Sequence, residues 1–331
     1  MRKIIMFGVR DEERTVAENW AKEHQVELSI NEENFTPELI ERVKDYDGLS
    51  LSQVGKLDES LYAQLHQMGI KQIAQRSAGV DMYNLALAKE NDIIISNVPS
   101  YSPESIAEWT VAMALNIIRK YDLIQERVNE HNFSWTPEIR GRLMGDMKVA
   151  VLGTGRIGQA VARFFKGFGC EIIGYDLYPN SQLSDLLTYG DSIEEVIKDA
   201  DIISLHMPAT EENYHLFDKE LLLKCKKDAI LLNMARGALI DTKALIEVLD
   251  EGHLMGAGLD TYEEEGPLIP KNLTDQTIED ELFLQVINHP KIIYSPHIAF
   301  YTDEAVKNLV EGGLNATLEV IETGTTRNRV N

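Results

Sequence analysis

Cysteine is scarce in this sequence, because its 331 residues include only Cys170 and Cys225. Each of the two lies in an apolar stretch. Together they have neither the spacing of a metal site nor the number needed for a framework of disulfides. We therefore expect two reduced, buried thiols and no bound metal.

Long apolar runs are also missing. The segment Met1–Gly8 has two cations followed by an apolar stretch that is too short for the core of a signal peptide, and no small-residue cleavage site follows it. No run approaches the roughly 20 apolar residues that cross a bilayer. We interpret Met1–Gly8 as the first strand, and we expect a soluble, cytoplasmic protein with no membrane partner.

Basic residues are in the minority. The chain has 32 lysines and arginines against 54 acidic residues, which gives a formal net charge of -22. A field of this sign repels phosphate backbones, so nucleic acid is not an expected partner. An anionic substrate would need a local cation or backbone N–H groups, so one particular arginine should matter.

Two series of short apolar runs alternate with helical patterns along the chain. With 331 residues and 44% hydrophobic content, a division into two domains is expected. Strands that alternate with helices predict right-handed β-α-β units and parallel sheets, hence two doubly wound α/β domains. The predicted strands are Lys3–Phe7, Val26–Ile30, Gly48–Ser52, Ile70–Gln75 and Ile93–Asn97 in the first series, and Met147–Leu152, Glu171–Tyr175, Ile202–His206, Ala229–Asn233, Gly256–Leu259 and Ile292–Ser295 in the second.

Two helical segments connect or follow these series. Ser102–His131 has apolar residues near helical spacing after Pro103 and predicts one long helix. Asp303–Ile321 follows the last strand and predicts a helix that packs back on the first domain. We therefore expect one Rossmann-like domain from residues 1–100 and 300–331, another from residues 101–299, and a double hinge near residues 99–102 and 299–301.

The strongest local pattern is an apolar strand that leads into a G-x-G-x-x-G turn and then a helix. Gly153 permits the tight turn, Gly155 lets the backbone approach a pyrophosphate, and Gly158 allows close packing of helix on sheet. The next strand ends in Asp176, whose carboxylate can bind ribose hydroxyls and repels a 2′-phosphate. Because no cation follows Asp176, we predict NAD rather than NADP as the cofactor of residues 101–299.

Polar residues follow three later strands of the second series, at the sheet edge where such folds bind ligands. Arg236 can hold a carboxylate with two parallel hydrogen bonds. His297 can deliver a proton, and Glu265 can raise the imidazole pKa and fix the ring. Any one of them alone is an ordinary loop residue. Together with a nicotinamide cofactor, the three predict reduction of a 2-keto acid.

With the glycine turn and these three residues, the sequence resembles the D-isomer-specific 2-hydroxyacid dehydrogenase family over nearly its whole length. The resemblance implies that Arg236, Glu265 and His297 are the catalytic residues. It also implies a flavodoxin-like substrate domain at residues 1–100 and 300–331. The matching stretches are Arg76–Asp81, Asn97–Pro103, Gly153–Gly158, Ser204–Pro208, Asn233–Gly237, Gly258–Glu265 and Ser295–His297.

The same resemblance implies binding residues and a partner. Backbone N–H groups near Ala78 and Gly79 are expected to hold the substrate carboxylate. Family members are usually dimers, so a homodimer through residues 102–131 is expected. The implied cofactor contacts, besides the glycine turn and Asp176, are Arg156, Ile157, His206, Met207, Pro208, Asn213, Ala235 and Asp260.

The segment Ala299–Thr302 and Tyr101 resemble the branch of the family that acts on D-lactate and D-2-hydroxyisocaproate. Pyruvate, with D-lactate as its product, is the substrate we expect first. Ser52 departs from the tyrosine or leucine usual in this branch and predicts a roomier pocket. Bulkier acids such as 2-ketoisocaproate or phenylpyruvate therefore stay open, and Ser52, Ala78, Tyr101 and Phe300 are expected to decide. A different class, an NAD-sensing corepressor-like interaction protein, is the remaining alternative.

Overall fold

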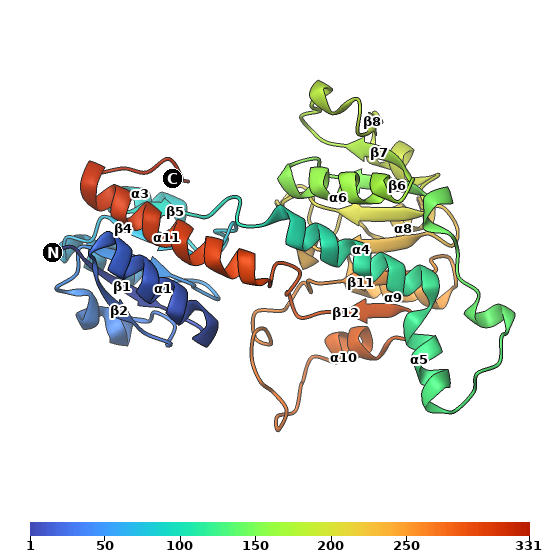
Figure 1. Ribbon diagram of the computed structural model, residues 1–331, viewed down its shortest axis with the longest axis horizontal. Helices are drawn as coiled ribbons and strands as arrows, with labels where there is room; N and C mark the ends of the chain where they lie inside the picture. Colours follow the sequence, from blue (N-terminus) through green and yellow to red (C-terminus); the bar gives the residue numbers. More distant parts are fainter. The chain divides into compact units, whose positions relative to one another are not determined.

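The computed structural model describes all residues, 1–331, and the chain forms two compact units (Figure 1). Unit 1 comprises Met1–Ser102 and Tyr301–Asn331, and unit 2 comprises Pro103–Phe300. The chain therefore crosses between the units twice, at residues 102–103 and 300–301. The hinge movement expected at these crossings stays a prediction.

Unit 1 is built on a sheet of five parallel strands in the order β2-β1-β3-β4-β5. This is the flavodoxin-like order, so the predicted fold of this part is confirmed. The central strands are buried on both faces, which explains why they read as continuous apolar runs. The strands are β1 (Lys3–Phe7), β2 (Glu27–Ile30), β3 (Gly48–Leu51), β4 (Gln72–Gln75) and β5 (Ile94–Ser96).

The helices of unit 1 cover this sheet, and the C-terminal one packs where the sequence predicts. Helix α11 lies beside α1 and against β3 and β4 (Figure 1). The approach to β3 is close, because a Cβ atom on Gly48 would overlap the side chain of Thr317. The helical segments are α1 (Asp11–His24), η1 (Pro37–Val43, a 3₁₀ helix), α2 (Ser60–Gln67), α3 (Leu85–Glu90) and α11 (Asp303–Thr323).

Unit 2 contains a sheet of seven parallel strands in the order β12-β11-β10-β9-β6-β7-β8. Counted from β6, the first six strands follow the Rossmann order, which confirms the predicted fold. The sequence did not reveal β8, because two residues are too few to show a period. The strands are β6 (Lys148–Leu152), β7 (Glu171–Tyr175), β8 (Thr188–Tyr189), β9 (Ile202–Leu205), β10 (Ile230–Asn233), β11 (Gly256–Leu259) and β12 (Ile292–Tyr294).

The prediction of one long helix over Ser102–His131 is wrong. The structure has two helices there, α4 (Pro103–Arg119) and α5 (Tyr121–Asn129). They are separated by Lys120, whose φ of 54° is left-handed and cannot continue an α-helix. Helix α4 buries an apolar face, whereas no residue of α5 is buried.

The other helices of unit 2 flank its sheet, with α6 packed along α4 (Figure 1). Cys170 and Cys225 are buried and unpaired, as predicted. None of the helices in the chain combines the length and apolar composition needed to cross a bilayer. The remaining segments are α6 (Arg156–Gly167), α7 (Ile193–Ile197), α8 (Lys219–Lys224), α9 (Thr242–Asp250) and α10 (Glu281–Asn288), with 3₁₀ turns η2 (Pro137–Ile139), η3 (Met144–Asp146), η4 (Ser181–Leu183) and η5 (Gly237–Leu239).

A buried ion pair fixes the carboxyl edge of the unit 1 sheet. The side chains of Arg76 and Glu13 are both fully buried and approach to 3.4 Å. Arg76 Nη2 also donates to the carbonyls of Phe7 and Gly8, both at 3.0 Å, and Nη1 donates to that of Ser50 at 3.1 Å. Because Arg76 itself follows β4, it connects the ends of three neighbouring strands.

We expect Arg76→Ala to lower the free energy of unfolding by about 3–5 kcal/mol. The variant loses the donor to three backbone carbonyls and the buried partner of Glu13, which then keeps only its pair with Arg10 at 3.0 Å. Arg14→Ala is the matched control. It removes an exposed pair with Glu32 (2.8 Å) and should cost no more than about 1 kcal/mol. Urea unfolding measures both variants, and equal losses would contradict this account.

Candidate active site

The carboxyl edge of unit 2 has a switch point between β6 and β9, which are neighbours in the sheet but not in sequence. Ligands of doubly wound sheets bind at such a point. Gly153 follows β6 with a φ of 90°, and a Cβ atom on it would lie 2.6 Å from the carbonyl carbon of His206. A Cβ atom on Gly158 would overlap the carbonyl oxygen of Gly153. Only glycine therefore fits at these two positions.

Gly155 differs from these two glycines. Apart from Gly155 itself and its two chain neighbours, no residue lies within 4 Å of the place where its Cβ atom would stand. It is also the N-cap of α6, where backbone N–H groups and the helix dipole favour a phosphate. The open space at a helix N-terminus fits the pyrophosphate of a dinucleotide.

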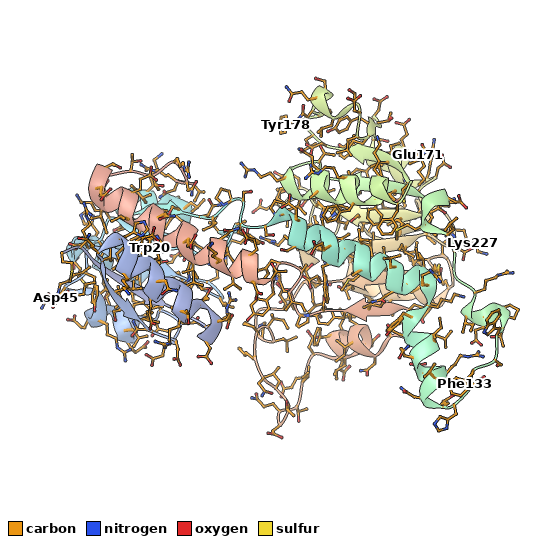
Figure 2. All side chains as sticks on the ribbon, viewed as in Figure 1. Trp20, Asp45, Phe133, Glu171, Tyr178 and Lys227 are labelled. Carbon is orange, nitrogen blue, oxygen red and sulfur yellow. The ribbon has the colours of Figure 1, made fainter.

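Asp176 stands at the end of β7, held beside the glycine turn. Its Oδ2 accepts hydrogen bonds from the backbone N–H of Thr154 (2.7 Å) and from the Thr154 hydroxyl (3.0 Å). Oδ1 accepts one from the N–H of Tyr178 (2.9 Å). Since a carboxylate has about four acceptor positions, Asp176 keeps capacity for a ribose hydroxyl. Leu177 and Tyr178 are exposed and uncharged, with Tyr178 on the periphery of unit 2 (Figure 2). The role of Thr154 in holding Asp176 was not predicted from the sequence, where only its position inside the glycine motif could have indicated it.

The loop after β9 carries further predicted cofactor contacts. Burial lowers the pKa of His206 to about 3, so its imidazole is neutral. Nε2 lies 2.7 Å from the hydroxyl of Ser204, while the buried Nδ1 has no partner in the protein. The backbone of His206 passes close to Gly153, and its neutral ring keeps one nitrogen without a partner in the protein. Asn213, by contrast, already bonds within the loop, to the N–H of Thr210 and the carbonyl of Pro208.

His297 and Glu265 form a close pair in unit 2. His297 Nδ1 lies 2.6 Å from Glu265 Oε1, and the other carboxylate oxygen accepts from the N–H of Tyr262 at 3.1 Å. His297 has a φ of 55°, a strained conformation for a residue with a side chain. Its backbone N–H is held by the carbonyls of Asp260 (2.8 Å) and Ser295 (3.0 Å).

Asp260 supports the same loop with its side chain. It is 1% exposed, and its carboxylate accepts hydrogen bonds from the Ser295 hydroxyl and from the N–H groups of Ile298 and Ala299, both at 2.9 Å. Burial raises the pKa of Asp260, and these hydrogen bonds together with the charge of His297 oppose that rise. Asp260 was predicted as a cofactor contact, but the bonds on its carboxylate belong to the His297 loop.

The pKa of His297 is raised by its surroundings. Burial alone would lower this pKa, but the hydrogen bond and charge of Glu265, together with the charge of Asp260, outweigh burial and the opposing charge of Arg236. The protonated form is thereby favoured. Because Glu265 occupies Nδ1, Nε2 is the nitrogen that can pass a proton to another molecule.

Arg236 follows β10 in a turn that is held by hydrogen bonds from the side chain of Asn233. Asn233 accepts from the N–H of Ala235 (3.0 Å) and donates to the carbonyl of Arg236 (2.9 Å). A Cβ atom on Gly237 would overlap the backbone of Tyr262, so this turn lies directly on the loop that leads to Glu265. The structure thus brings the three predicted catalytic residues to one edge. Sequence reasoning assigned no role to Asn233, although it lies within the motif.

The predicted substrate residues of unit 1 follow β3 and β4, which are adjacent strands. Ser52 follows β3, and a Cβ atom on Gly8 after β1 would lie 2.8 Å from its carbonyl oxygen. Gln75, at the end of β4, connects the two loops. It accepts from the N–H of Gln53 (3.1 Å) and donates to the hydroxyl of Ser77 (3.1 Å).

The loop at Ala78 and Gly79 has its carbonyls anchored. Asn97 donates to the carbonyl of Ala78 and Ser77 to that of Gly79, both at 2.7 Å. The N–H groups of Ala78 and Gly79 have no acceptor in the protein, which fits the binding of an anion. Of the other two predicted residues, Tyr101 accepts from Asn308 through its carbonyl (2.6 Å), and Phe300 is the half-buried last residue of unit 2.

Comparison with known families identifies the chain. Residues 111–299 match the model of the D-isomer specific 2-hydroxyacid dehydrogenases, NAD binding domain. The protein belongs to this family. The resemblance predicted from the sequence is therefore confirmed, and so is the NAD-dependent dehydrogenase class with NAD as the cofactor.

Individual family members are similar over their full length. A D-lactate dehydrogenase of Streptococcus agalactiae serotype III is 61% identical over 99% of this chain and 100% of its own. A crystal structure of a D-lactate dehydrogenase from Treponema pallidum superposes with a TM-score of 0.92 at 39% identity, over 99% of both chains. A structure of D-2-hydroxyisocaproate dehydrogenase reaches the same TM-score, 0.92, at 34% identity and the same coverage, 99% of both chains.

We expect Gly158→Ala to lower the stability of the protein by about 1–3 kcal/mol, because its Cβ atom has no space beside Gly153. Gly167→Ala, in the same helix, is the matched control. Its Cβ atom meets nothing within 4 Å, so the temperature of thermal unfolding should be unchanged or slightly raised.

Gly155→Ala should fold normally but bind NADH more weakly, since the added methyl group would stand where the pyrophosphate is expected to approach. Normal NADH affinity in Gly155→Ala, measured by fluorescence titration, would contradict this assignment.

Proposed function

We propose that this protein is a D-lactate dehydrogenase that reduces pyruvate to D-lactate and catalyses the reverse reaction. The observation that carries the proposal is the 2.6 Å contact between His297 and Glu265, at the same sheet edge as Arg236. The full-length similarity to a streptococcal chain of that name, at 61% identity, supports the choice of substrate.

Each residue of the trio has a task in this reaction. Bound NADH supplies the hydride. Arg236 holds the substrate carboxylate, and a guanidinium can do so with two parallel hydrogen bonds. His297 donates its Nε2 proton to the keto oxygen as the alcohol forms, and Glu265 stabilises the imidazolium through Nδ1. In the oxidation of D-lactate the same imidazole accepts the proton.

The binding residues predicted from the sequence complete the proposal. The unused N–H groups of Ala78 and Gly79 bind the substrate carboxylate. Asp176 binds the ribose hydroxyls and selects NAD. Ser52, Tyr101 and Phe300 shape the substrate pocket. The further cofactor contacts are Gly153, Gly155, Arg156, Ile157, Gly158, His206, Met207, Pro208, Asn213, Ala235 and Asp260.

A preference for bulkier 2-keto acids is the second candidate. The small side chain of Ser52 favours it, and so does the similarity to D-2-hydroxyisocaproate dehydrogenase at 34% identity. No feature of the structure favours the corepressor-like alternative.

We also propose a cytoplasmic homodimer formed through residues 102–131, which contain α4 and α5. An apolar groove of about 500 Å³ lies between α4 and α6, lined by Val111, Leu115 and Phe164 among others. Beyond α5, Phe133 (Figure 2) and Trp135 are 69% and 96% exposed. Apolar surface of this kind is often covered by a second subunit. Sedimentation as a monomer at micromolar concentration would contradict the dimer.

Initial rates with NADH against pyruvate, 2-ketobutyrate, 2-ketoisocaproate and phenylpyruvate test the substrate. We expect the highest kcat/KM with pyruvate, and a product that is oxidised by a D-lactate-specific enzyme and not by an L-lactate-specific one. A higher kcat/KM with 2-ketoisocaproate or phenylpyruvate would establish the second candidate instead. No NADH oxidation with any of the four would refute both.

Glu265→Gln should move the pH–rate profile of pyruvate reduction to lower pH. Reduction requires protonated His297, so its rate falls as the pH rises through the His297 pKa. Removing the anion that raises this pKa should shift the fall downward by roughly 1–2 pH units. Glu263→Gln is the matched control, because Glu263 pairs with His215 (2.7 Å) instead. An unmoved profile in Glu265→Gln, or equal shifts in both variants, would show that the role assignment is wrong.

A further inference from the structure

A chain of hydrogen bonds leads from helix α4 to the loop that carries His297. The indole Nε1 of Trp109 donates to the hydroxyl oxygen of Ser295 at 3.0 Å. That hydroxyl donates to Asp260 Oδ1 in a short hydrogen bond. Asp260 in turn accepts from the N–H groups of Ile298 and Ala299, which directly follow His297.

The direction of this chain follows from its donors and acceptors. An indole N–H can only donate, and a serine hydroxyl has one proton to give. With the Trp109 N–H on its oxygen, Ser295 presents a lone pair to the indole and its proton to Asp260. Ser295 is 4% exposed and Asp260 1%, so water offers little competition and each bond counts for more than it would at the surface.

We propose that Trp109 and Ser295 are positioning residues for His297, acting through Asp260. They hold Asp260 as a fixed carboxylate, which secures the left-handed backbone at His297 and places a negative charge beside its ring. This inference rests on the proposed function of His297 as the proton donor. Neither residue touches the substrate or the cofactor in this scheme.

Three charged groups act on the imidazole: Glu265 and Asp260 raise its pKa, and Arg236 lowers it. Of these three charged groups, only Asp260 is hydrogen-bonded to Ser295. The phenol of Tyr294, whose buried hydroxyl has no partner, stays neutral because burial and the charges of Glu265 and Asp260 raise its pKa. A change at Ser295 or Trp109 therefore reaches His297 through the charge and the position of Asp260.

Helix α4 links these hydrogen bonds to the apolar groove as well. Val111, Ala112 and Leu115 of the same helix line the apolar groove against α6. The side chain of Trp109 is bonded instead to the loop after β12. A shift of α4 would therefore alter the groove and the support of His297 together.

The test is the His297 titration in Ser295→Ala and Trp109→Phe. Ser295→Ala removes a donor from Asp260, which raises the pKa of that carboxyl and favours its protonated, uncharged form. We expect the pKa of His297 to fall by roughly 0.5–1 unit. Trp109→Phe keeps a ring in place but removes the N–H, so a smaller shift in the same direction is expected. Ser295→Thr keeps the hydroxyl and should restore the wild-type value.

Two readouts separate this inference from the proposed function. Histidine ring signals followed by NMR, with His297 assigned from a His297→Asn variant, give the pKa without any substrate. The pH–rate profile of pyruvate reduction gives it during turnover, and there the fall in rate should move to lower pH. Inactivity of the wild-type enzyme toward 2-keto acids would refute the proposed function, while the NMR titration would still decide the role of Trp109 and Ser295.

Trp20→Phe is the matched control. Trp20 donates its indole N–H to Asn315 at 2.8 Å, joining α1 to α11 in unit 1 (Figure 2). The same substitution there removes a similar hydrogen bond, so stability should drop while the His297 pKa stays unchanged. The inference is overturned if Ser295→Ala leaves the His297 pKa at its wild-type value, or if Trp20→Phe shifts it as much as Trp109→Phe does.

Discussion

The carboxylate of Asp260 accepts three hydrogen bonds from the segment Ser295–Ala299, while the Asp260 carbonyl accepts the N–H of His297. A φ of 55° at His297 is a strained conformation, and it persists only where the surroundings determine it. One buried residue after β11 thus fixes the loop after β12. The contact between His297 and Glu265 depends on that loop being fixed.

Unit 1 uses a buried charge of the opposite sign in a comparable place. Arg76 donates to the carbonyls of Phe7, Gly8 and Ser50 at the carboxyl edge of its sheet, whereas Asp260 accepts from N–H groups at the carboxyl edge of the other. Backbone groups at strand ends lack sheet partners, and a buried side chain with several donors or acceptors can satisfy a number of them at once. Desolvating these charges costs free energy. The hydrogen bonds that they make hold the loops with the predicted binding residues in one geometry.

The glycine turn after β6 depends on three residues that have no side chain. Gly153 and Gly158 leave no space for a Cβ atom, and Gly155 leaves open space. Thr154, inside the same turn, then holds Asp176 with two hydrogen bonds. The same short segment therefore positions both the predicted place of the pyrophosphate and the carboxylate predicted to bind the ribose.

All strands except β8 could be predicted from sequence, and so could the glycine turn and the three polar residues after β10, β11 and β12. Each of these predictions rests on local periodicity or on the rule that parallel strands end at one edge. The break at Lys120 could not be predicted, since its left-handed backbone leaves no compositional trace within an otherwise helical pattern. The role of Asn233 was also hidden, because a buried asparagine in an apolar strand gives no sign of which backbone groups it bonds.

What the sequence by itself determined is the order of the elements, the family and the candidates for the reacting groups. Only the tertiary structure decided how those groups are supported. Trp109 and Ser295 are 186 positions apart, and Ser295 and Asp260 are 35 apart. Hydrogen bonds between such distant positions depend on packing in three dimensions, and no periodicity or spacing in a single sequence records them.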